Sequence, residues 1–532
     1  MISENNFHDS EKKRKMLTGD MLRRSAQRFA RKAAIIFRGP DRREEISYRA
    51  LDENANRLAH ALIGLGLPKG TKISMLSRNL PEYGAVFFGV ARTGHVLNNV
   101  SILYAPEELG WVLNKSDTEV LIFDAQFADK VAAIREACPR IRHFIIIGEK
   151  SPADTAIPFR QFIMDQPADL PDVLIDERDA FCMTYTGGTT GRPKGVMMNH
   201  RAREVTAQTV AFEERITDRD VVAIVTPMFH VAALNIMFQP AILMGATTVF
   251  VTPWSADAFI AAVEAEKISA GFMVPTQANA LSTHPELETR SLASWNKLAF
   301  AGAPMPDWVQ QELMRRLPAL RLTQIYGQSE MGVIAALPPE FLPAKLGSVG
   351  RQPYNVDVAV LRPDGTPADV GEMGEVASRG DNVMMCYCNE PEQTAQFFKL
   401  GNGWGLSGDV GVVDADGFIT LIDRAKDMLI SGGENVYPKE IEQVIYQLPE
   451  VAECAVFGIP DDKWGEVPAA YLLLKAGCTL DEARVLAQCE SKLARLKRPR
   501  LIRFVDSFPK TPIGKIQKNL LKEPYWQGRK KI

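Results

Sequence analysis

The stretch Tyr185-Thr-Gly-Gly-Thr-Thr-Gly-Arg-Pro-Lys-Gly195 carries most of what this sequence predicts. It offers many backbone N–H and hydroxyl donors and almost no side chain that could fill a core, which suits a loop that wraps phosphate oxygens. The flanking runs Phe181–Tyr185 and Val196–Met198 are short, apolar and typical of strands, and a helical pattern begins at about Arg201. We therefore predict a phosphate-binding connection between two strands.

The spacing of this loop excludes a Walker A motif. That motif needs Gly-Lys followed by Ser or Thr, so that the lysine opens a helix and the hydroxyl meets magnesium. Here Pro193 precedes Lys194 and Gly195 follows it, with no Ser or Thr next. Taken alone, the loop leaves a flexible surface turn as the alternative.

Bulk properties indicate a multidomain enzyme without nucleic-acid affinity. At 532 residues the chain is too long for one ordinary core, and a formal charge of −3 gives no electrostatic basis for binding nucleic acid. The seven cysteines have neither zinc-site spacing nor the pattern of a disulfide framework. No apolar leader or transmembrane segment is evident and the C-terminus matches no sorting signal, so a cytoplasmic location is expected.

The alternation of elements predicts an α/β fold. A helical pattern covers Leu51–Leu67, and strand-like runs occur at 72–76, 120–123, 221–225 and 247–251, separated by helix-length segments. Such alternation is typical of layers built on mostly parallel sheets.

A second module begins near the run Asp423-Arg-Ala-Lys-Asp427. The pattern predicts an amphipathic helix at 439–448, strands at 451–457 and 469–474, a helix at 481–493 and a strand at 501–505. This is an α+β unit of about 100 residues, an ordinary domain size. We place the two domains at 1–425 and 426–532.

Six further motifs follow or flank the loop in a recognisable order. They are Pro227-Met-Phe-His230, Phe300-Ala-Gly-Ala-Pro304, Gln324-Ile-Tyr-Gly-Gln-Ser-Glu330, Trp404-Gly-Leu-Ser-Gly-Asp409, the Asp423–Asp427 run and Pro509-Lys-Thr-Pro-Ile-Gly-Lys515. With the loop, they resemble the adenylate-forming superfamily of AMP-forming acyl-CoA synthetases, aryl-CoA ligases, luciferases and adenylation domains. The chain departs from the usual pattern in having Gly187 for Ser, and Ser329 and Ser407 for Thr.

The resemblance implies a site for ATP and AMP. Tyr326 would stack on adenine, Asp409 would bind the ribose hydroxyls, and Glu330 with Thr190 would hold Mg²⁺, which prefers carboxylate, phosphate and water oxygens. The full nucleotide set implied is Thr186, Gly187, Gly188, Thr189, Thr190, Gly191, Lys194, Gly302, Ala303, Pro304, Tyr326, Gly327, Ser329, Asp409 and Arg424.

The same resemblance implies a two-step reaction and a mobile C-terminal domain. Lys515 would bridge the substrate carboxylate and the α-phosphate, with His230 beside the adenylate and acyl pocket. The small domain would then turn about Lys426 so that a thiol can displace AMP. The positions implied for CoA are Gly432, Gly433, Glu434, Trp464, Arg498 and Arg500, arginine being suited to a 3′-phosphate.

The expected acyl pocket is small-residue and apolar. Its candidates are Val231, Ala232, Leu234, Asn235 and Met331, with no arginine among them for a second carboxylate. This favours a hydrophobic monoacid, either a medium- to long-chain fatty acid or an aryl or alicyclic acid.

The leading hypothesis is therefore an AMP-forming acyl-CoA ligase that uses ATP, Mg²⁺ and CoA. The alternative is a ligase that loads a separate carrier protein, and a luciferase-like oxygenase would share every motif. A non-catalytic nucleotide-binding protein fits less well, because Glu330, Asp409 and Lys515 are all present. The oligomeric state stays open, with a homodimer as one option.

Overall fold

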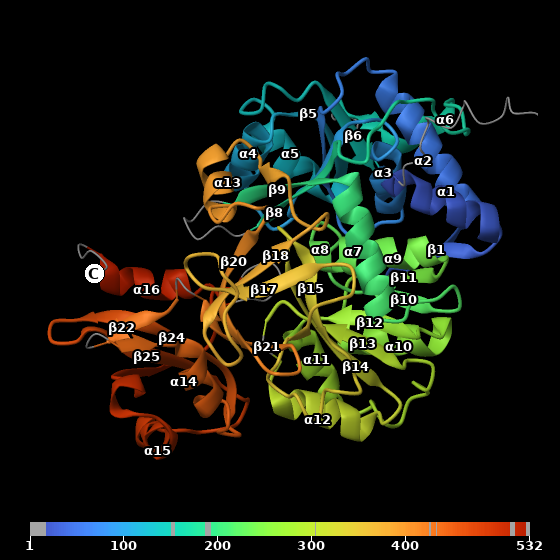
Figure 1. The fold of residues 1–532 in the computed structure, drawn as a ribbon. Coiled ribbons are helices and arrows are strands. Elements are labelled where there is room, and N and C mark those ends of the chain that lie inside the picture. Colours follow the sequence, from blue (N-terminus) through green and yellow to red (C-terminus); the bar gives the residue numbers. More distant parts are fainter. Residues whose placement is uncertain are drawn as a thin grey trace, which may run out of the picture.

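Three β-sheets organise the chain into a large body and a smaller one (Figure 1). The computed structural model describes residues 17–149, 155–186, 193–303, 305–424, 427–431, 434–510 and 516–527, with only the backbone at Arg424. The large body holds two sheets, and the small body holds one. The predicted class, α/β with mostly parallel sheets and a small α+β C-terminal domain, is confirmed. The exact boundary at 425–426 falls outside the described residues and stays a prediction.

An eight-stranded sheet carries the predicted phosphate loop. Its order is β19-β9-β8-β4-β3-β5-β6-β7, in which the strands from β8 to β7 pair in parallel and β9 and β19 close one edge antiparallel. The strands are β3 (Lys72–Leu76), β4 (Val96–Asn99), β5 (Thr118–Asp124), β6 (His143–Ile147), β7 (Ile157–Pro158), β8 (Ala180–Thr186), β9 (Lys194–Asn199) and β19 (Cys386–Tyr387).

A thirteen-stranded sheet carries most of the other motifs. Strands β14, β13, β12, β10, β11 and β1 pair in parallel, and antiparallel strands extend both ends. The strands are β1 (Ala33–Arg38), β2 (Arg43–Ser47), β10 (Val221–Ile224), β11 (Thr247–Val251), β12 (Ala270–Met273), β13 (Lys297–Phe300), β14 (Arg321–Gln328), β15 (Gly332–Leu337), β16 (Gly350–Arg351), β17 (Asp357–Leu361), β18 (Gly374–Arg379), β20 (Gly405–Val413) and β21 (Phe418–Arg424).

Helices fill the space between and around these sheets. Helix α7 runs between the two sheets (Figure 1), and one hydrophobic core joins residues of both sheets to it. Because α7 is enclosed on almost every side, even its polar residues Arg203 and Glu204 are buried. The helices of the large body are α1 (Thr18–Phe29), α2 (Tyr48–Ile63), α3 (Glu82–Val90), α4 (Pro106–Lys115), η2 (Ala125–Phe127), α5 (Ala128–Ile134), α6 (Phe159–Met164), α7 (His200–Glu213), α8 (Val231–Ala233), η3 (Leu234–Phe238), α9 (Gln239–Met244), α10 (Ala256–Glu266), α11 (Pro275–Ser282), α12 (Asp307–Arg316) and α13 (Pro391–Phe397).

The small body has its own sheet and its own core. Its strands are β22 (Leu429–Ser431), β23 (Glu434–Val436), β24 (Val451–Asp461), β25 (Gly465–Leu474) and β26 (Leu501–Phe504), and its helices are α14 (Pro438–Ile445), α15 (Glu482–Lys492), η4 (Arg495–Lys497) and α16 (Lys518–Trp526). Helix α14 buries Ile441, Val444 and Ile445 in that core, which is the apolar face that the sequence pattern predicts. Among the residues described, no helix has the length and apolarity needed to cross a bilayer.

Candidate active site

The phosphate loop is the connection between β8 and β9. These strands pair antiparallel, and the pairing of Thr186 with Lys194 brings the two ends of the loop face to face. The loop residues Gly187, Gly188, Thr189, Thr190 and Gly191 lie outside the described residues. The predicted strand–loop–strand arrangement is thus present at both ends of the motif.

Lys194 and Glu330, predicted on opposite sides of the nucleotide phosphates, are joined through Tyr387. The Tyr387 hydroxyl donates to Glu330 Oε1 at 2.9 Å, and Lys194 Nζ lies 4.9 Å from the centre of the Tyr387 ring. Lys194 also donates to Gln393 on α13. Burial, and then the neighbouring Glu330 carboxylate, raise the pKa of Tyr387, so its phenol stays protonated and donates. Neither Tyr387 nor Gln393 was predicted from the sequence.

Tyr387 reaches this position because β19 extends the loop-bearing sheet. Cys386 and Tyr387 pair with Met197 and Val196 of β9. Just before β19, the Met384 N–H donates to the Glu330 carbonyl at 2.7 Å. The segment therefore fastens the loop-bearing sheet to the Glu330 motif of the other sheet.

Tyr326 and Asp409, predicted on the adenine and ribose, are in direct contact. The Tyr326 hydroxyl donates to Asp409 Oδ2 at 2.6 Å. Gln328 Nε2 donates to the same oxygen at 3.0 Å and to the Ser407 carbonyl at 2.8 Å. Gln328 occupies the variable position of its motif, so the sequence did not predict it. Asp409 also pairs in register with Arg424, whose backbone lies on the neighbouring strand β21.

Two glycines of these motifs are required by geometry. A Cβ on Gly327 would lie 1.9 Å from the Gly332 carbonyl oxygen, so the β14–β15 hairpin closes only without a side chain there. Gly302 turns with φ of +90°, which favours glycine, and places the half-buried Ala303 next in the chain. Ser329 is buried, whereas Pro304 lies outside the described residues.

Most of the residues predicted for the acyl pocket lie on a turn after His230. The imidazole Nδ1 of His230 accepts the Ala232 N–H at 3.2 Å and so caps α8. A π-helical turn, η3, follows directly. The pocket candidates Ala232, Leu234, Asn235 and Met331 are buried, and Val231 is half-buried.

The structure also brings an arginine to this region. Gln239 Nε2 donates to the backbone carbonyl of Arg203 on α7 at 2.9 Å, and Asn235 Nδ2 donates to Gln239 Oε1 at 3.1 Å. No sequence pattern indicated Arg203, because the contact joins two helices that are separated along the chain.

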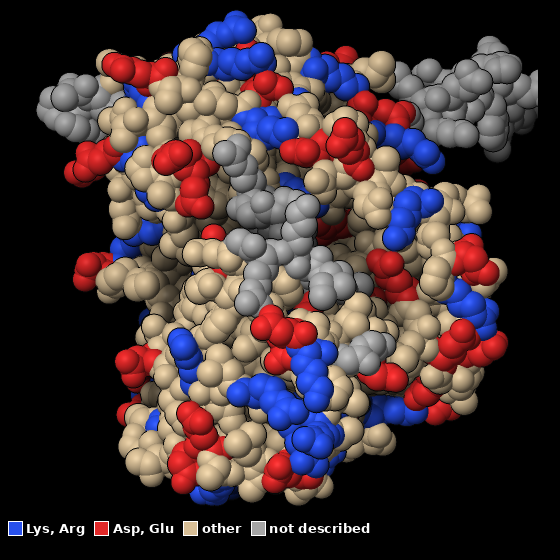
Figure 2. Space-filling view, turned by 90° about the vertical axis from the view of Figure 1, so that its left-hand side faces the viewer, with Lys and Arg blue, Asp and Glu red and all other residues tan. Residues whose placement is uncertain are grey.

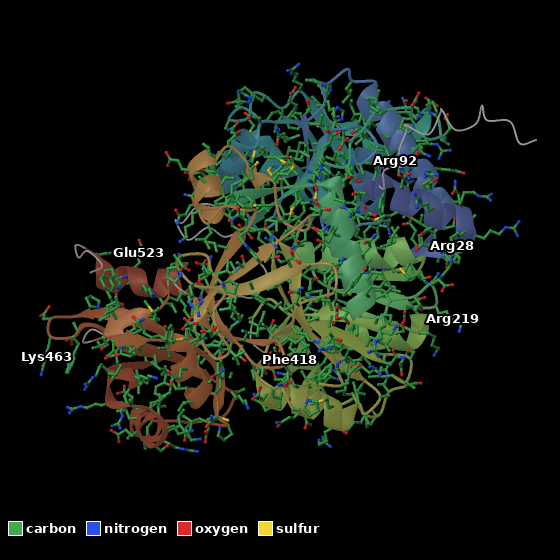
Figure 3. The ribbon with its side chains drawn as sticks, in the orientation of Figure 1. Arg28, Arg92, Arg219, Phe418, Lys463 and Glu523 are labelled. Carbon is green, nitrogen blue, oxygen red and sulfur yellow. The ribbon has the colours of Figure 1, made fainter. Side chains whose placement is uncertain are left out.

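The CoA candidates lie on the small body. Trp464 occupies the turn of the β24–β25 hairpin with 39% of its surface exposed, and Figure 3 shows its neighbour Lys463 at the outer tip. Figure 2 shows Lys and Arg gathered on the lower half of the face that carries the small body. Glu434 and Arg500 are exposed, but Arg498 pairs with Glu490 at 3.0 Å. Gly432, Gly433, the hinge Lys426 and the catalytic candidate Lys515 lie outside the described residues.

With this geometry in hand, comparison with known proteins identifies the class. Residues 22–388 match the AMP-binding enzyme family, and residues 440–515 match the AMP-binding enzyme C-terminal domain. The chain belongs to this family of adenylate-forming enzymes.

Its relatives include ligases of two substrate types. It is 35% identical to a feruloyl-CoA synthase of Amycolatopsis sp over 474 residues, covering 89% of this chain and 92% of the relative. It is 34% identical to a long-chain-fatty-acid–CoA ligase of Mycobacterium tuberculosis, covering 95% of this chain and 98% of the relative.

A solved structure gives the same class. The anthranilate CoA ligase AuaEII, solved in complex with anthranoyl-AMP, superposes with a TM-score of 0.88 at 27% identity, covering 96% of this chain and 97% of that one. The predicted enzyme class, an AMP-forming acid–thiol ligase acting through an adenylate, is confirmed.

Proposed function

We propose that the site between the two large sheets uses MgATP to turn a hydrophobic carboxylic acid into an acyl-adenylate, which CoA then takes as a thioester. The observation that supports this proposal is that side chains from motifs far apart in the sequence contact one another. Tyr326 contacts Asp409, and Tyr387 contacts both Lys194 and Glu330, although these residues lie on distant parts of the chain. Such a meeting supplies adenine, ribose and phosphate contacts together.

The first step brings two anions together, so it needs fixed positive charge. The carboxylate attacks the α-phosphorus of ATP, the bond to pyrophosphate breaks, and negative charge accumulates on the α-phosphate oxygens. Lys515 would meet that charge, and Lys194 with the loop N–H groups would hold the leaving pyrophosphate. One preorganised donor of this kind lowers a barrier by roughly 3–4 kcal/mol.

The residues present fit a magnesium ion brought in by the nucleotide. Within the described part of the chain, no group of three or more His, Cys, Asp or Glu residues could hold a metal alone. Mg²⁺ needs only one or two carboxylates when phosphates and water complete its shell. Glu330, with Thr190, would supply the protein ligands, and the ion would neutralise phosphate charge. Tyr387 would keep the Glu330 carboxylate in one orientation through its 2.9 Å hydrogen bond.

The second step requires access for a thiol. We propose that the small body turns about Lys426, so that Lys515 leaves and the segment at 432–434 faces the adenylate. The CoA thiol then attacks the acyl carbon and AMP departs with the bonding electron pair. Trp464 and Arg500 are the better-placed contacts for the nucleotide end of CoA, because Arg498 would first have to leave Glu490.

The acid itself is proposed to be hydrophobic. The pocket candidates are buried and mostly apolar, and the relatives act on an aryl acid and on long-chain fatty acids. We further propose that the enzyme is cytoplasmic, which the seven free cysteines support. A homodimer is one option for its oligomeric state, and light scattering would test it.

The test is pyrophosphate release with MgATP across carboxylic acids from acetate through long fatty acids to benzoates and cinnamates, with and without CoA. One class of acids should give multi-turnover release with AMP and a thioester only when CoA is present. Adenylate formation that CoA leaves unchanged would move the acceptor to a carrier protein, the alternative stated above. Chelation of Mg²⁺ by EDTA should stop release in either case.

A further inference from the structure

The contact between α7 and the turn η3–α9 contains polar side chains that are sealed from solvent. Arg203 is 2% exposed, and Asn235 and Gln239 are fully buried. Gln239 links the other two, since it donates to the Arg203 carbonyl and accepts from Asn235 Nδ2. We call these three residues the α7–η3 polar cluster.

Two atoms of this cluster have no hydrogen-bond partner among the described residues. Arg203 Nε is a donor and Asn235 Oδ1 is an acceptor, and both are buried. The Arg203 guanidinium also forms no ion pair within the described part of the chain. Burying a charge without hydrogen bonds or a counter-ion is costly, so such a group is expected to meet a partner in the working protein.

Arg92 provides a comparison, because it is a buried arginine with a structural role. Arg92 is buried to the same degree, at 4% exposure, and lies in the interior of the large body (Figure 3). Its guanidinium pairs with Asp52 at 2.6 Å and also donates to Asn56 at 2.7 Å and to the Gly19 carbonyl at 3.0 Å. Arg92 Nε, like Arg203 Nε, has no hydrogen-bond partner among the described residues. The difference is that Arg92 has a carboxylate and two further acceptors on its terminal nitrogens, whereas Arg203 has no such partner within the described part of the chain.

The cluster borders the candidate acyl pocket. Asn235 is itself a pocket candidate, and it lies on the π-helical turn η3, a feature often found at functional sites. One turn beyond Arg203 on α7, Thr206 Oγ1 would be 2.5 Å from a Cβ on Gly332, the residue after the pocket candidate Met331. The two pocket-forming elements, η3 and the start of β15, therefore both pack on the same stretch of α7.

We propose that Arg203 and Asn235 form a polar subsite at the inner end of the acyl pocket, which binds a hydroxyl group on the far end of the acid. A hydroxyl oxygen accepts from Arg203 while its proton is donated to Asn235 Oδ1, so one group satisfies both unpartnered atoms. A methyl group in the same place satisfies neither. The preferred substrates are then hydrophobic acids with a distal hydroxyl, either phenolic or aliphatic. This inference rests on the proposed function and names its substrate class.

The experiment compares acids that differ only at the distal group. The pairs are 4-hydroxycinnamate with 4-methylcinnamate, and ω-hydroxy fatty acids with the fatty acids in which methyl replaces the hydroxyl, over several chain lengths. The measurement is kcat/KM for CoA-thioester formation. Wild-type enzyme should favour the hydroxylated member of one series by about tenfold or more, the effect of a hydrogen bond to a charged group. The series that shows the preference distinguishes a phenolic from an aliphatic substrate.

Variants then locate the preference. Arg203→Met should bring the two members of the pair within about twofold of each other, with the hydroxylated acid losing most. Arg201→Met, two residues earlier on α7 and half-exposed, is the matched control and should keep the wild-type ratio. Where Arg203→Met does not fold, Arg203→Lys and Asn235→Val serve instead, and each should reduce the ratio.

Two results would overturn the subsite. One is a wild-type enzyme that shows no preference for any hydroxylated acid, which leaves Arg203 and Asn235 with buried water only. The other is a loss in Arg203→Met that is equal for both members, as a purely structural residue would give. Neither result touches the ligase itself, whereas failure of every acid to yield a thioester would contradict the proposed function.

Discussion

At the scale of single residues, Tyr387 is the side chain that ties the phosphate side of the site together. Its hydroxyl fixes one oxygen of Glu330 while its ring lies beside the Lys194 ammonium. Without that hydroxyl, Glu330 would lose one of the contacts that orient its carboxylate and would offer Mg²⁺ a less ordered ligand. We expect Tyr387→Phe to raise the Mg²⁺ concentration for half-maximal pyrophosphate release by about tenfold, with a smaller change in KM for the acid.

The control for this prediction is another buried phenol. Tyr48 donates to the Ala246 carbonyl far from the site, so Tyr48→Phe should lower the unfolding midpoint and leave the Mg²⁺ dependence as it is. Titration of Mn²⁺ with nucleotide, followed by electron paramagnetic resonance, gives a readout independent of turnover. An unchanged metal dependence in Tyr387→Phe would show that the hydroxyl only supports packing.

Side-chain contacts between residues far apart in the sequence could not be predicted from the sequence. The resemblance to the family predicted Tyr326, Asp409 and Glu330 as site residues, because each stands in a short motif that matches the family's pattern. Tyr387 and Gln328 act through contacts across 57 and 81 residues of chain, and no nearby pattern indicates such partners. Arg203 was missed as well, since an arginine in a helix ordinarily predicts an exposed position.

At the scale of elements, α7 is unusual because it carries ionisable groups into the interior. It begins at His200, whose ring stacks on Phe181 at 4.7 Å and is 1% exposed. Burial lowers the pKa of His200 to about 4. In the unfolded chain His200 binds a proton near pH 6.5, whereas in the folded chain it does so only near pH 4. The free energy of unfolding therefore falls as the pH drops from 6.5 to about 4.

This element makes a measurable prediction. Between pH 7 and pH 5 the free energy of unfolding should fall by about 2 kcal/mol through His200 alone. His200→Phe, which keeps a ring against Phe181, should remove that part of the loss. Urea unfolding of both proteins at the two pH values measures the difference. Equal losses in His200→Phe and wild type would contradict the assignment.

Helices and strands were predicted from the sequence better than the contacts of single residues. Short apolar runs predicted β3, β10 and β11, because strands buried on both faces are apolar along their length. The amphipathic pattern predicted α14, because that helix buries one face. The helix expected at 51–67 instead spans Tyr48–Ile63, since Ser47 caps it by accepting the Ala50 N–H. The pairing of β19 with β9 could not be predicted, because a two-residue strand has no periodicity.

At the scale of the whole molecule, the large and small bodies meet close to the predicted hinge. Lys439, on α14 of the small body, donates its Nζ to the Leu421 carbonyl at 2.8 Å, and its N–H donates to Asp423 at 2.9 Å. Further away, Lys475 Nζ lies 4.5 Å from the ring centre of Trp308 on α12. Burial lowers the pKa of Lys439. Its two hydrogen bonds to β21 join the small body to the large one beside the predicted hinge.

If the two half-reactions need different orientations, a stiffened hinge separates them. Lys426→Pro fixes φ at the pivot, so it should spare pyrophosphate release in the first turnover and slow thioester formation from supplied acyl-adenylate by tenfold or more, as expected when a domain motion gates a step. Lys515→Ala should do the reverse, because we propose that its charge serves adenylate formation and not the thiol step. Rapid-quench measurement of both half-reactions on both variants makes the comparison. Equal loss in the two steps for either variant would mean that one orientation serves the whole reaction, and the small body would then be a lid rather than a turning domain.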